Sequence, residues 1–503
     1  MAKNQNWNYR KMAFLVITAG ILIRFGMASF YSVSGDACWQ LSVSRFIAEN
    51  HRIPVYELLG RMEPFWAPPM FHFMAAFFYG IFSSLSPNSG EFGMKMISPL
   101  FGSLSLVVSY LIARKLFDEK TAFYSTVFVA FLPMFLDYGI VSYIDSTVTF
   151  FITLSIYFAL NDRHLLSAVA AGLAAMTKYN GIFIFPLLAY IVYRNTRNKI
   201  ITLKKLAAMV AILALIGAPW FARNYAEFQN PFWPFFNFMS REKISTDLAA
   251  ADSLTFTTFN PLNLLSFNSI TFTYLAFFGV PEGNYKNLFF FDIPNLSILL
   301  VIWLSSTLFF IFPIFKGFKM KDKPTAGILY IWMAMYALVL ALYISNVRWN
   351  ATRFFLPAVP ALAMIWGNGM SRIIIKNKKL KIVFLAIFSI IIIGFIFTVA
   401  AKILLASSQW NFYKEDFEWV MKNTESSAVI MPGIQCLSYY THRGTLEGKP
   451  ENLKKADYLW LNKNFKLESN AIASQELVDA IRKNEYEKAY ENKKTGTSIY
   501  RIK

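Results

Sequence analysis

A small set of acidic residues stands next to the apolar segments of this 503-residue chain. Asp36 follows the first apolar run within a few residues, and Asp145 directly precedes another. An ionisable group at the boundary between lipid and water is costly to keep there, and such groups often serve a site. A carboxylate in this setting can take a proton from an attacking hydroxyl. We therefore interpret Asp36 and Asp145 as candidate catalytic residues.

Cations recur at the ends of the same segments, at Lys178, Arg223 and Arg353. Such groups stabilise the negative charge of a departing phosphate. Because a phosphate is already a competent leaving group, one carboxylate suffices, in contrast to the two-carboxylate scheme of glycoside hydrolysis. The pattern favours transfer of a group from a lipid-linked phosphate to a nucleophile, with the acids and cations converging on one face. Further supporting candidates are Arg45, Glu63, Arg348 and Tyr143.

Each of these residues also has a structural interpretation. Asp145 immediately precedes an apolar run, so it could cap a helix. Lys178 could extend its ammonium group to water at a turn, and boundary cations such as Arg223 and Arg353 are common without function. Asp36 alone could be a solvated loop acid. The recurrence of acids and cations at external segment ends favours the functional interpretation.

The composition indicates a polytopic membrane protein. The chain is 56% hydrophobic and 17% aromatic, with a mean hydropathy of +0.41, more apolar surface than a soluble protein can bury. The net charge of +19 does not indicate a nucleic-acid partner, because residues 405–503 hold 15 Lys and Arg against 13 Asp and Glu. The excess lies in the apolar part, where positive loops set orientation in the bilayer. Cys38 and Cys436 predict neither a disulfide framework nor a metal site.

The apolar pattern predicts about eleven membrane spans within residues 1–404. Basic loops indicate a cytoplasmic N-terminus, an external Asp36 and an external C-terminus. Arg24, inside the first span, is expected to reach towards the membrane surface. The expected spans are 12–30, 92–113, 121–138, 145–160, two short spans within 165–193, 206–221, 296–315, 327–345, 351–369 and 381–404.

Two external loops and one broken segment stand out. Residues 31–91 form an external loop, because its apolar stretch 69–82 is short for a span and is expected to lie along the membrane surface. Residues 177–181 interrupt an apolar run and predict a turn, where Lys178 needs an anionic partner or carbonyl groups. Residues 222–292 form the second long external loop, whose aromatic content argues against disorder.

The C-terminal residues 405–503 differ in character from the rest. Charges of both signs are interspersed, residues 428–431 and 457–461 resemble strands, and residues 475–490 resemble an amphipathic helix. This pattern predicts a small soluble α/β domain outside the membrane. It contains no recognisable catalytic motif.

At these residues the sequence resembles the polyprenyl-phosphate-sugar-dependent glycosyltransferases of the GT-C superfamily, in particular the group of protein O-mannosyltransferases and lipid A aminoarabinose transferases. The similarity runs along the whole membrane region, and the tail is similar to the soluble domain of prokaryotic members. The matching segments are Gly35-Asp36 with Arg45, Pro68-Pro69, 145–151, 177–181, Pro219-Trp220 with Arg223-Asn224, 353–357 with Pro360, and, in the tail, 417–420 and 437–443.

The resemblance implies that Asp36 is the catalytic base and that Asp145 positions or polarises the acceptor. It also implies that Lys178, Arg223 and Arg353 hold the lipid phosphate. Two positions depart from the family pattern, since Ala67 replaces a basic residue before the two prolines and Ala37 replaces a second acid. These departures leave donor headgroup binding and a divalent-metal requirement open. No cofactor is expected.

The predicted function is transfer of a sugar from a polyprenyl-phosphate donor to a hydroxyl of a protein, lipid or glycan acceptor, on the outer face of a prokaryotic cell membrane, with inversion. One alternative is a secondary transporter or lipid flippase, with Lys178 at a broken helix. The polar residues, however, gather at one face instead of the midplane, and the two halves show no internal repeat. A membrane-anchored receptor would not explain why acids and cations recur at external segment ends.

Overall fold

The computed structural model describes residues 2–58, 65–86, 89–236, 309–320, 322–346, 351–432, 435–462 and 486–502, together with residues 262, 277, 307 and 479. Glu63, Arg348 and most of the predicted loop 222–292 lie outside these ranges. The chain divides into two compact units, each built from separate stretches. The first contains Met1–Ala28, Ser98–Ile140 and Ile144–Lys402, and the second contains Ser29–Ile97, Val141–Tyr143 and Ile403–Lys503.

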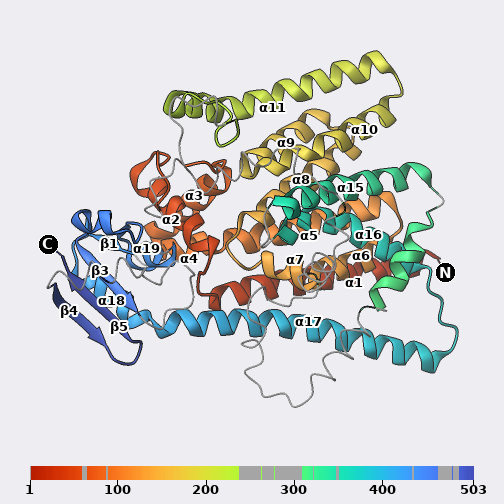
Figure 1. The fold of residues 1–503 in the computed structure, drawn as a ribbon. Coiled ribbons are helices and arrows are strands. Elements are labelled where there is room, and N and C mark those ends of the chain that lie inside the picture. The colour runs from red at the N-terminus through yellow and green to blue at the C-terminus, as the bar shows by residue number, and fades with distance from the viewer. Residues whose placement is uncertain are drawn as a thin grey trace. The chain divides into compact units, whose positions relative to one another are not determined.

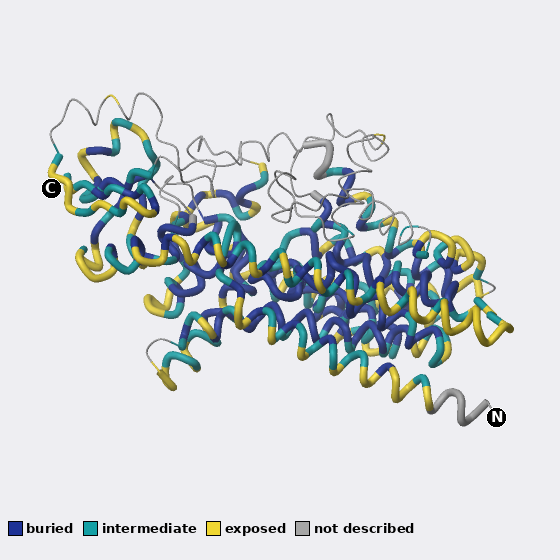
Figure 2. The backbone as a smooth tube through the Cα atoms, turned by 90° about the horizontal axis from the view of Figure 1, so that it is seen from below, coloured by how far each residue is buried: buried dark blue, intermediate teal, exposed yellow. Residues whose placement is uncertain are grey.

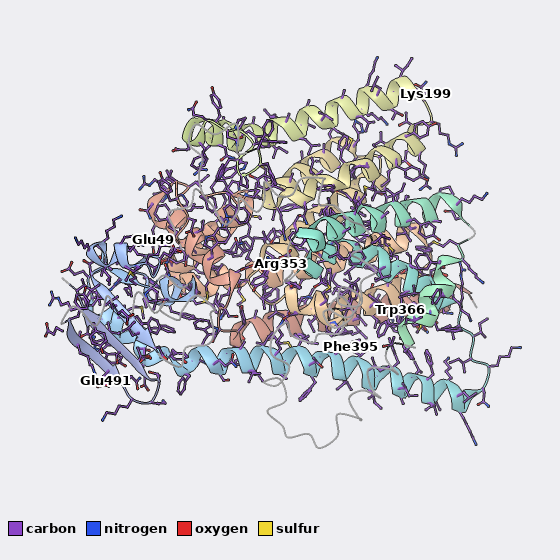
Figure 3. The ribbon with its side chains drawn as sticks, in the orientation of Figure 1. Glu49, Lys199, Arg353, Trp366, Phe395 and Glu491 are labelled. Carbon is purple, nitrogen blue, oxygen red and sulfur yellow. A yellow bond between two sulfur atoms is a disulfide. The ribbon has the colours of Figure 1, made fainter. Side chains whose placement is uncertain are left out.

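The first unit is a bundle of apolar helices (Figure 1). Its packed centre pairs α6 with α16, and α8 with α9. The Phe310 ring stacks on the rings of Trp366 and Phe395, with ring centroids 5.5 and 5.6 Å away, and Figure 3 labels these last two residues. The helices and 3₁₀ segments described are α1 (Ala2–Phe30), α5 (Ile97–Leu116), α6 (Glu119–Phe131), α7 (Pro133–Tyr138), α8 (Ile144–Leu160), α9 (His164–Thr177), η1 (Tyr179–Ile184), α10 (Phe185–Thr196), α11 (Lys199–Phe228), α15 (Lys323–Asn346), η6 (Ala351–Ala358), α16 (Val359–Ser371) and α17 (Lys378–Phe412). The last residues of α1 and α17 and the first residue of α5 belong to the second unit.

Several helices are suited to crossing a bilayer. In the part of the chain that the structure describes, six are long and apolar enough, and four shorter apolar helices accompany them. In α11 and α17 only 17% of the most apolar window is buried, so their exposed apolar side chains form surfaces suited to lipid. Figure 2 shows the buried positions concentrated inside the bundle. The predicted polytopic helical fold is confirmed, and the count of eleven spans stays a prediction.

The apolar run 165–193 breaks where the sequence predicts. α9 ends at Thr177, η1 turns the chain, and α10 returns in the opposite direction. The return is fixed at the far end, because the Asn195 side chain donates to Asp162 Oδ1 at 2.8 Å. α9 consequently lies between α8 and α11 (Figure 1). α11 continues through Pro219 to Phe228, so the first residues of the predicted loop 222–292 are helical.

Arg24 is fully buried, so the expectation that it reaches the membrane surface is wrong. Its guanidinium donates to the carbonyl oxygens of Gly20 at 3.0 Å and Val129 at 3.3 Å. The Val129 carbonyl would pair with the backbone N–H four residues on, but Pro133 stands there and has none. Arg24 therefore satisfies a carbonyl that the proline leaves without its helical donor.

Replacing Arg24 with methionine is expected to lower the free energy of unfolding by about 1–3 kcal/mol, because a buried carbonyl loses its donor. Arg10 lies exposed on the same helix, and Arg10→Met serves as the matched control with little expected effect. Unfolding in detergent, followed by circular dichroism, measures both variants. Equal stability of the two would contradict this account of Arg24.

The second unit joins three helices to a small α/β domain. Its helices α2 (Asp36–Asn50), α3 (Met70–Leu85) and α4 (Gly90–Lys95) pack on one another. The C-terminal part adds α18 (Lys414–Asn423), α19 (Gln435–Thr441) and η7 (Pro450–Lys455). α2 and α3 both fall within the predicted external loop 31–91. α3 has 16 residues, fewer than the roughly 20 that a span requires.

The C-terminal sheet has the strand order β2-β1-β3-β5-β4. β1 (Val429–Met431) runs parallel to β2 (Gly444–Thr445) and to β3 (Tyr458–Asn462), whereas β5 (Thr497–Arg501) pairs antiparallel with β3 and with β4 (Glu487–Asn492). The two predicted strands correspond to β1 and β3. The predicted helix over 475–490 is wrong at its C-terminal end, where residues 487–490 belong to β4, and most of its other residues lie outside the described part.

Candidate active site

The centre of the candidate site in the first unit is an ion pair between Lys178 and Asp145. Lys178 Nζ lies 2.7 Å from Asp145 Oδ1, and their side chains are only 13% and 3% exposed. Lys178 stands at the end of α9 and Asp145 in the first turn of α8. Because the two helices are antiparallel neighbours, their polar ends meet. The anionic partner that the sequence requires for Lys178 is therefore Asp145.

The turn that carries Lys178 depends on a glycine. η1 folds back onto α9, and a β-carbon on Gly181 would lie 2.4 Å from the Ala174 backbone carbon. No larger residue fits there without moving the turn. The Lys178 backbone N–H donates to the Ala174 carbonyl, and its own carbonyl accepts from the Gly181 N–H, so both sides of the turn are fixed.

A second cation shares an aromatic ring with Lys178. Lys178 Nζ lies 3.9 Å from the centroid of the Phe354 ring, and Arg353 Cζ lies 5.8 Å from the same centroid. Both positions favour attraction between a cation and the face of an aromatic ring. Arg353 and Phe354 belong to η6, which packs against α8 and α15, and Figure 3 labels Arg353. Two of the three cations predicted to bind phosphate thus meet at one ring.

The third cation, Arg223, connects to this group through aromatic side chains. Its Cζ lies 5.1 Å from the Trp220 ring and 5.0 Å from the Phe228 ring. Trp220 Nε1 donates to the Tyr179 hydroxyl at 2.9 Å, and that hydroxyl donates to the Trp233 carbonyl at 2.9 Å. Burial raises the pKa of Tyr179, so the phenol stays neutral and can donate. Because Tyr179 follows Lys178, this chain ties α11 to the turn.

Asp36 belongs to the second unit and is the first residue of α2. Gly35 precedes it with φ +58°, a left-handed conformation that glycine adopts without steric cost. A β-carbon at Gly35 would lie 2.9 Å from the Tyr143 hydroxyl oxygen, so Tyr143 stands beside the start of α2. The supporting candidate Tyr143 is therefore next to the predicted base in the fold, 107 residues later in the chain.

Arg45, nine residues after Asp36 on α2, is held by several partners. Its Nη1 lies 2.7 Å from Glu91 Oε1 and donates to the Tyr439 carbonyl at 3.1 Å, and its Nη2 donates to the Ser438 carbonyl at 3.3 Å. Cys38, on the same helix, forms a disulfide with Cys436. The expectation that the two cysteines form no disulfide framework is therefore wrong in this respect.

The structure therefore brings Asp145, Lys178 and Arg353 together and links Arg223 to them. In the other unit, Tyr143 lies beside the start of α2, the helix that carries Asp36 and Arg45. Sequence reasoning missed Phe354 as the shared ring, and no spacing pattern indicates it. It also missed the disulfide, although the only two cysteines both fall in segments predicted to be external. Among the described residues, no group of three or more His, Cys, Asp or Glu side chains could hold a metal ion.

The fold resembles that of known membrane enzymes. The protein is similar to ArnT from Cupriavidus metallidurans bound to undecaprenyl phosphate, with TM-score 0.63, 13% identity and 97% and 98% of the two chains covered. It is also similar to the Archaeoglobus fulgidus oligosaccharyltransferase, with TM-score 0.58, 15% identity and coverage of 90% and 69%. A third similar structure is the mycobacterial arabinofuranosyltransferase AftD, with TM-score 0.52, 14% identity and coverage of 98% of this chain and 40% of AftD. A search of curated protein sequences finds no significant match.

A family model adds evidence from the sequence. Residues 67–222 match the model of the dolichyl-phosphate-mannose-protein mannosyltransferases. This range contains Asp145 and Lys178 together with the turn at 177–181. The predicted resemblance to the GT-C superfamily is confirmed by the match of part of the chain to this family model and by the fold: the protein has the membrane-spanning fold of the GT-C glycosyltransferases that it resembles.

Proposed function

We propose that the protein transfers a sugar from a polyprenyl-phosphate donor to an acceptor hydroxyl on the extracytoplasmic face of the membrane, with inversion at the anomeric carbon. The observation that carries the proposal is the buried Lys178–Asp145 pair, with Arg353 on the same Phe354 ring. Such a group of cations is expensive to desolvate and fits an anionic headgroup delivered from the bilayer.

In the proposed reaction Lys178, Arg223 and Arg353 hold the donor phosphate. As the bond between the anomeric carbon and the phosphate oxygen breaks, negative charge grows on that oxygen, and fixed cations stabilise it. Asp145 keeps the Lys178 ammonium in one orientation and can polarise or position the acceptor. Arg223 is held between two rings and hydrogen-bonds to Asn224 Oδ1 at 3.1 Å, which limits its movement.

Asp36 is proposed as the general base. It takes the proton of the acceptor hydroxyl while the acceptor oxygen bonds to the anomeric carbon and the lipid phosphate leaves with the electron pair of the broken bond. A direct displacement of this kind inverts the anomeric carbon. The left-handed Gly35 before Asp36 and the nearby Tyr143 hydroxyl define the start of α2, which supports a fixed orientation for the carboxylate.

The disulfide supports the extracytoplasmic assignment. Cys38 and Cys436 are bonded, so both lie on the same side of the membrane, and the number of crossings between them is even. The predicted topology has ten. Disulfides persist mainly in oxidising compartments outside the cytosol. This supports an external α2 and an external C-terminal domain.

The ligands of similar proteins support the same donor class. One similar ArnT structure contains undecaprenyl phosphate, and one similar Archaeoglobus fulgidus oligosaccharyltransferase structure, with TM-score 0.54 and 14% identity, contains an inhibitory peptide and a dolichol-phosphate. Applied to this chain, a polyprenyl phosphate is the lipid part of the donor. Protein, lipid and glycan hydroxyls are the acceptor classes to compare.

The test is incubation of the purified protein with a radiolabelled polyprenyl-phosphate sugar and each acceptor class, with label in the acceptor as the readout. We expect transfer to at least one class, and NMR of the product is expected to show the inverted anomer. A parallel assay follows movement of the labelled lipid across liposomes containing the protein. Flux without transfer would reject the proposal in favour of a transporter or flippase.

A further inference from the structure

The segment Phe30–Arg45, which carries Asp36, makes several contacts with residues 407–443 near the C-terminus of the chain. These contacts join positions almost 400 residues apart within the second unit. They are of three chemical kinds: a covalent bond, an ionic network and hydrogen bonds to backbone groups. Each kind reaches a different part of the segment.

The covalent contact is the disulfide between Cys38 and Cys436. Cys38 lies in the first turn of α2, two residues after Asp36, and its N–H donates to the Gly35 carbonyl at 3.0 Å. Cys436 is in α19. Both cysteines are fully buried. The disulfide therefore ties the turn that begins with Asp36 directly to the C-terminal domain.

The ionic network fixes the other end of the segment. Arg45 pairs with Glu91 at 2.7 Å, and His442 Nε2 lies 2.8 Å from the same carboxylate oxygen. Arg45 also donates to the carbonyl groups of Tyr439 and Ser438 in α19. The Arg45 side chain is only 7% exposed, so this is a desolvated contact. Charge-assisted hydrogen bonds of this kind are stronger than neutral ones.

Hydrogen bonds hold the residues before Asp36. The Tyr440 hydroxyl donates to the Val33 carbonyl at 2.7 Å, and its ring stacks on Phe417 and Trp410 with centroids 5.0 and 5.6 Å away. Burial raises the pKa of Tyr440, so the phenol keeps its proton and remains a donor. The Ser407 hydroxyl donates to the Phe30 carbonyl and accepts from the Ser32 N–H.

We propose that the C-terminal domain is the positioning element for the catalytic base, and that the Cys38–Cys436 disulfide and Tyr440 hold the residues on either side of Asp36. The inference rests on the proposed role of Asp36. It assigns the domain a function in the reaction, although the domain's own sequence shows no catalytic motif. Tyr440, Cys38 and Cys436 are positioning residues, because they act through the backbone next to Asp36.

The expected effect is on the rate of the bound complex. Tyr440→Phe keeps the aromatic stack and removes one hydrogen bond, so kcat should fall by up to about tenfold. Loss of the disulfide frees the first turn of α2, and a displacement near 1 Å can cost about 10²-fold in kcat. The donor KM should stay unchanged in both cases, because the proposed phosphate ligands belong to the other unit.

The experiment compares Tyr440→Phe and the double variant Cys38→Ala/Cys436→Ala with the wild type. Tyr490→Phe is the matched control, because it also removes one tyrosine hydrogen bond in the domain, the 2.9 Å bond to Asp416, without touching the segment. Dithiothreitol provides a second test. Since the chain has only two cysteines, the reductant should lower kcat in the wild type and leave the double variant unaffected.

Hydrogen exchange of the amides of residues 33–40 gives a readout that does not need activity. Faster exchange together with lower kcat at unchanged donor KM, in Tyr440→Phe but not in Tyr490→Phe, is the expected result. Unchanged kcat and exchange in the folded variants would overturn the inference, as would a change in KM alone. If the wild type transfers no sugar, the proposed function fails, and unchanged exchange would independently reject the positioning contacts.

Discussion

Replacing Asp36 with asparagine is expected to lower kcat for sugar transfer by about 10²–10⁴-fold, because the amide cannot accept the proton of the attacking hydroxyl. Asparagine has nearly the same size, so the start of α2 and the disulfide two residues later should be kept. Donor binding should also be retained, since the cations proposed to hold the phosphate are elsewhere. The measurement is single-turnover transfer with saturating labelled donor, accompanied by a donor-binding titration.

Glu49 provides the matched control for this variant. It is an exposed acid on the same helix, accepts a hydrogen bond from the Tyr79 hydroxyl at 3.0 Å, and is labelled in Figure 3. Glu49→Gln makes the same chemical change as Asp36→Asn and is expected to leave kcat unchanged. Wild-type turnover by a folded Asp36→Asn protein would show that another group is the base.

Neutralising either member of the Lys178–Asp145 pair is expected to lower the free energy of unfolding by about 3–5 kcal/mol, because the remaining charge is buried without its partner. Asp145→Asn and Lys178→Met are the single changes. The double variant carries neither charge, so most of the stability should return. Chemical unfolding in detergent, analysed as a double-mutant cycle, measures the coupling.

Sugar transfer and the free energy of unfolding should respond differently in the same double-mutant cycle. The double variant lacks a phosphate-binding cation, so transfer should stay low and donor KM high even where stability is restored. Lys422 and Glu418 form an exposed pair at 3.5 Å, and Lys422→Met is the matched control, with an expected change below about 1 kcal/mol. Recovery of transfer in the double variant would mean that the pair has only a structural role.

The two sets of experiments address different parts of the proposed reaction. Asp36 is tested as a proton acceptor, which acts in the transition state and changes kcat. Lys178 is tested as a ligand of the donor phosphate, which contributes to binding and to departure of the lipid phosphate, so both kinetic parameters respond. That Asp36 and Lys178 act on the same acceptor and the same donor stays a prediction.

Much of the fold follows from local patterns along the chain. Apolar runs of membrane length predict the helices, because a bilayer leaves the backbone few alternatives. The break at 177–181 is visible because Lys178 and Gly181 interrupt an apolar run, and η1 lies there. The strands β1 and β3 are similarly visible as short apolar runs between polar residues. The helix predicted over 475–490 is wrong at residues 487–490, because pairing with β5 outweighs the local helical pattern.

The candidate residues were likewise identifiable by type. An acid or a cation beside a membrane-length segment is unusual enough to be noticed, so Asp36, Asp145, Lys178, Arg223 and Arg353 emerge without coordinates. The residues that these side chains contact could not be identified from the sequence. That Lys178 pairs with Asp145 depends on α8 and α9 being antiparallel neighbours, and the shared Phe354 ring depends on η6 packing against α8.

By itself, then, the sequence determined that the protein is a membrane protein, where the chain breaks before α10, and which acidic and basic side chains are available for the reaction. Those properties depend on composition and on neighbours along the chain. The tertiary structure alone decided that Arg24 turns inward to the Val129 carbonyl, that Lys178 meets Asp145, and that Cys38 meets Cys436. Such contacts join residues 33 to 398 positions apart, and only the packing of whole helices decides which distant groups meet.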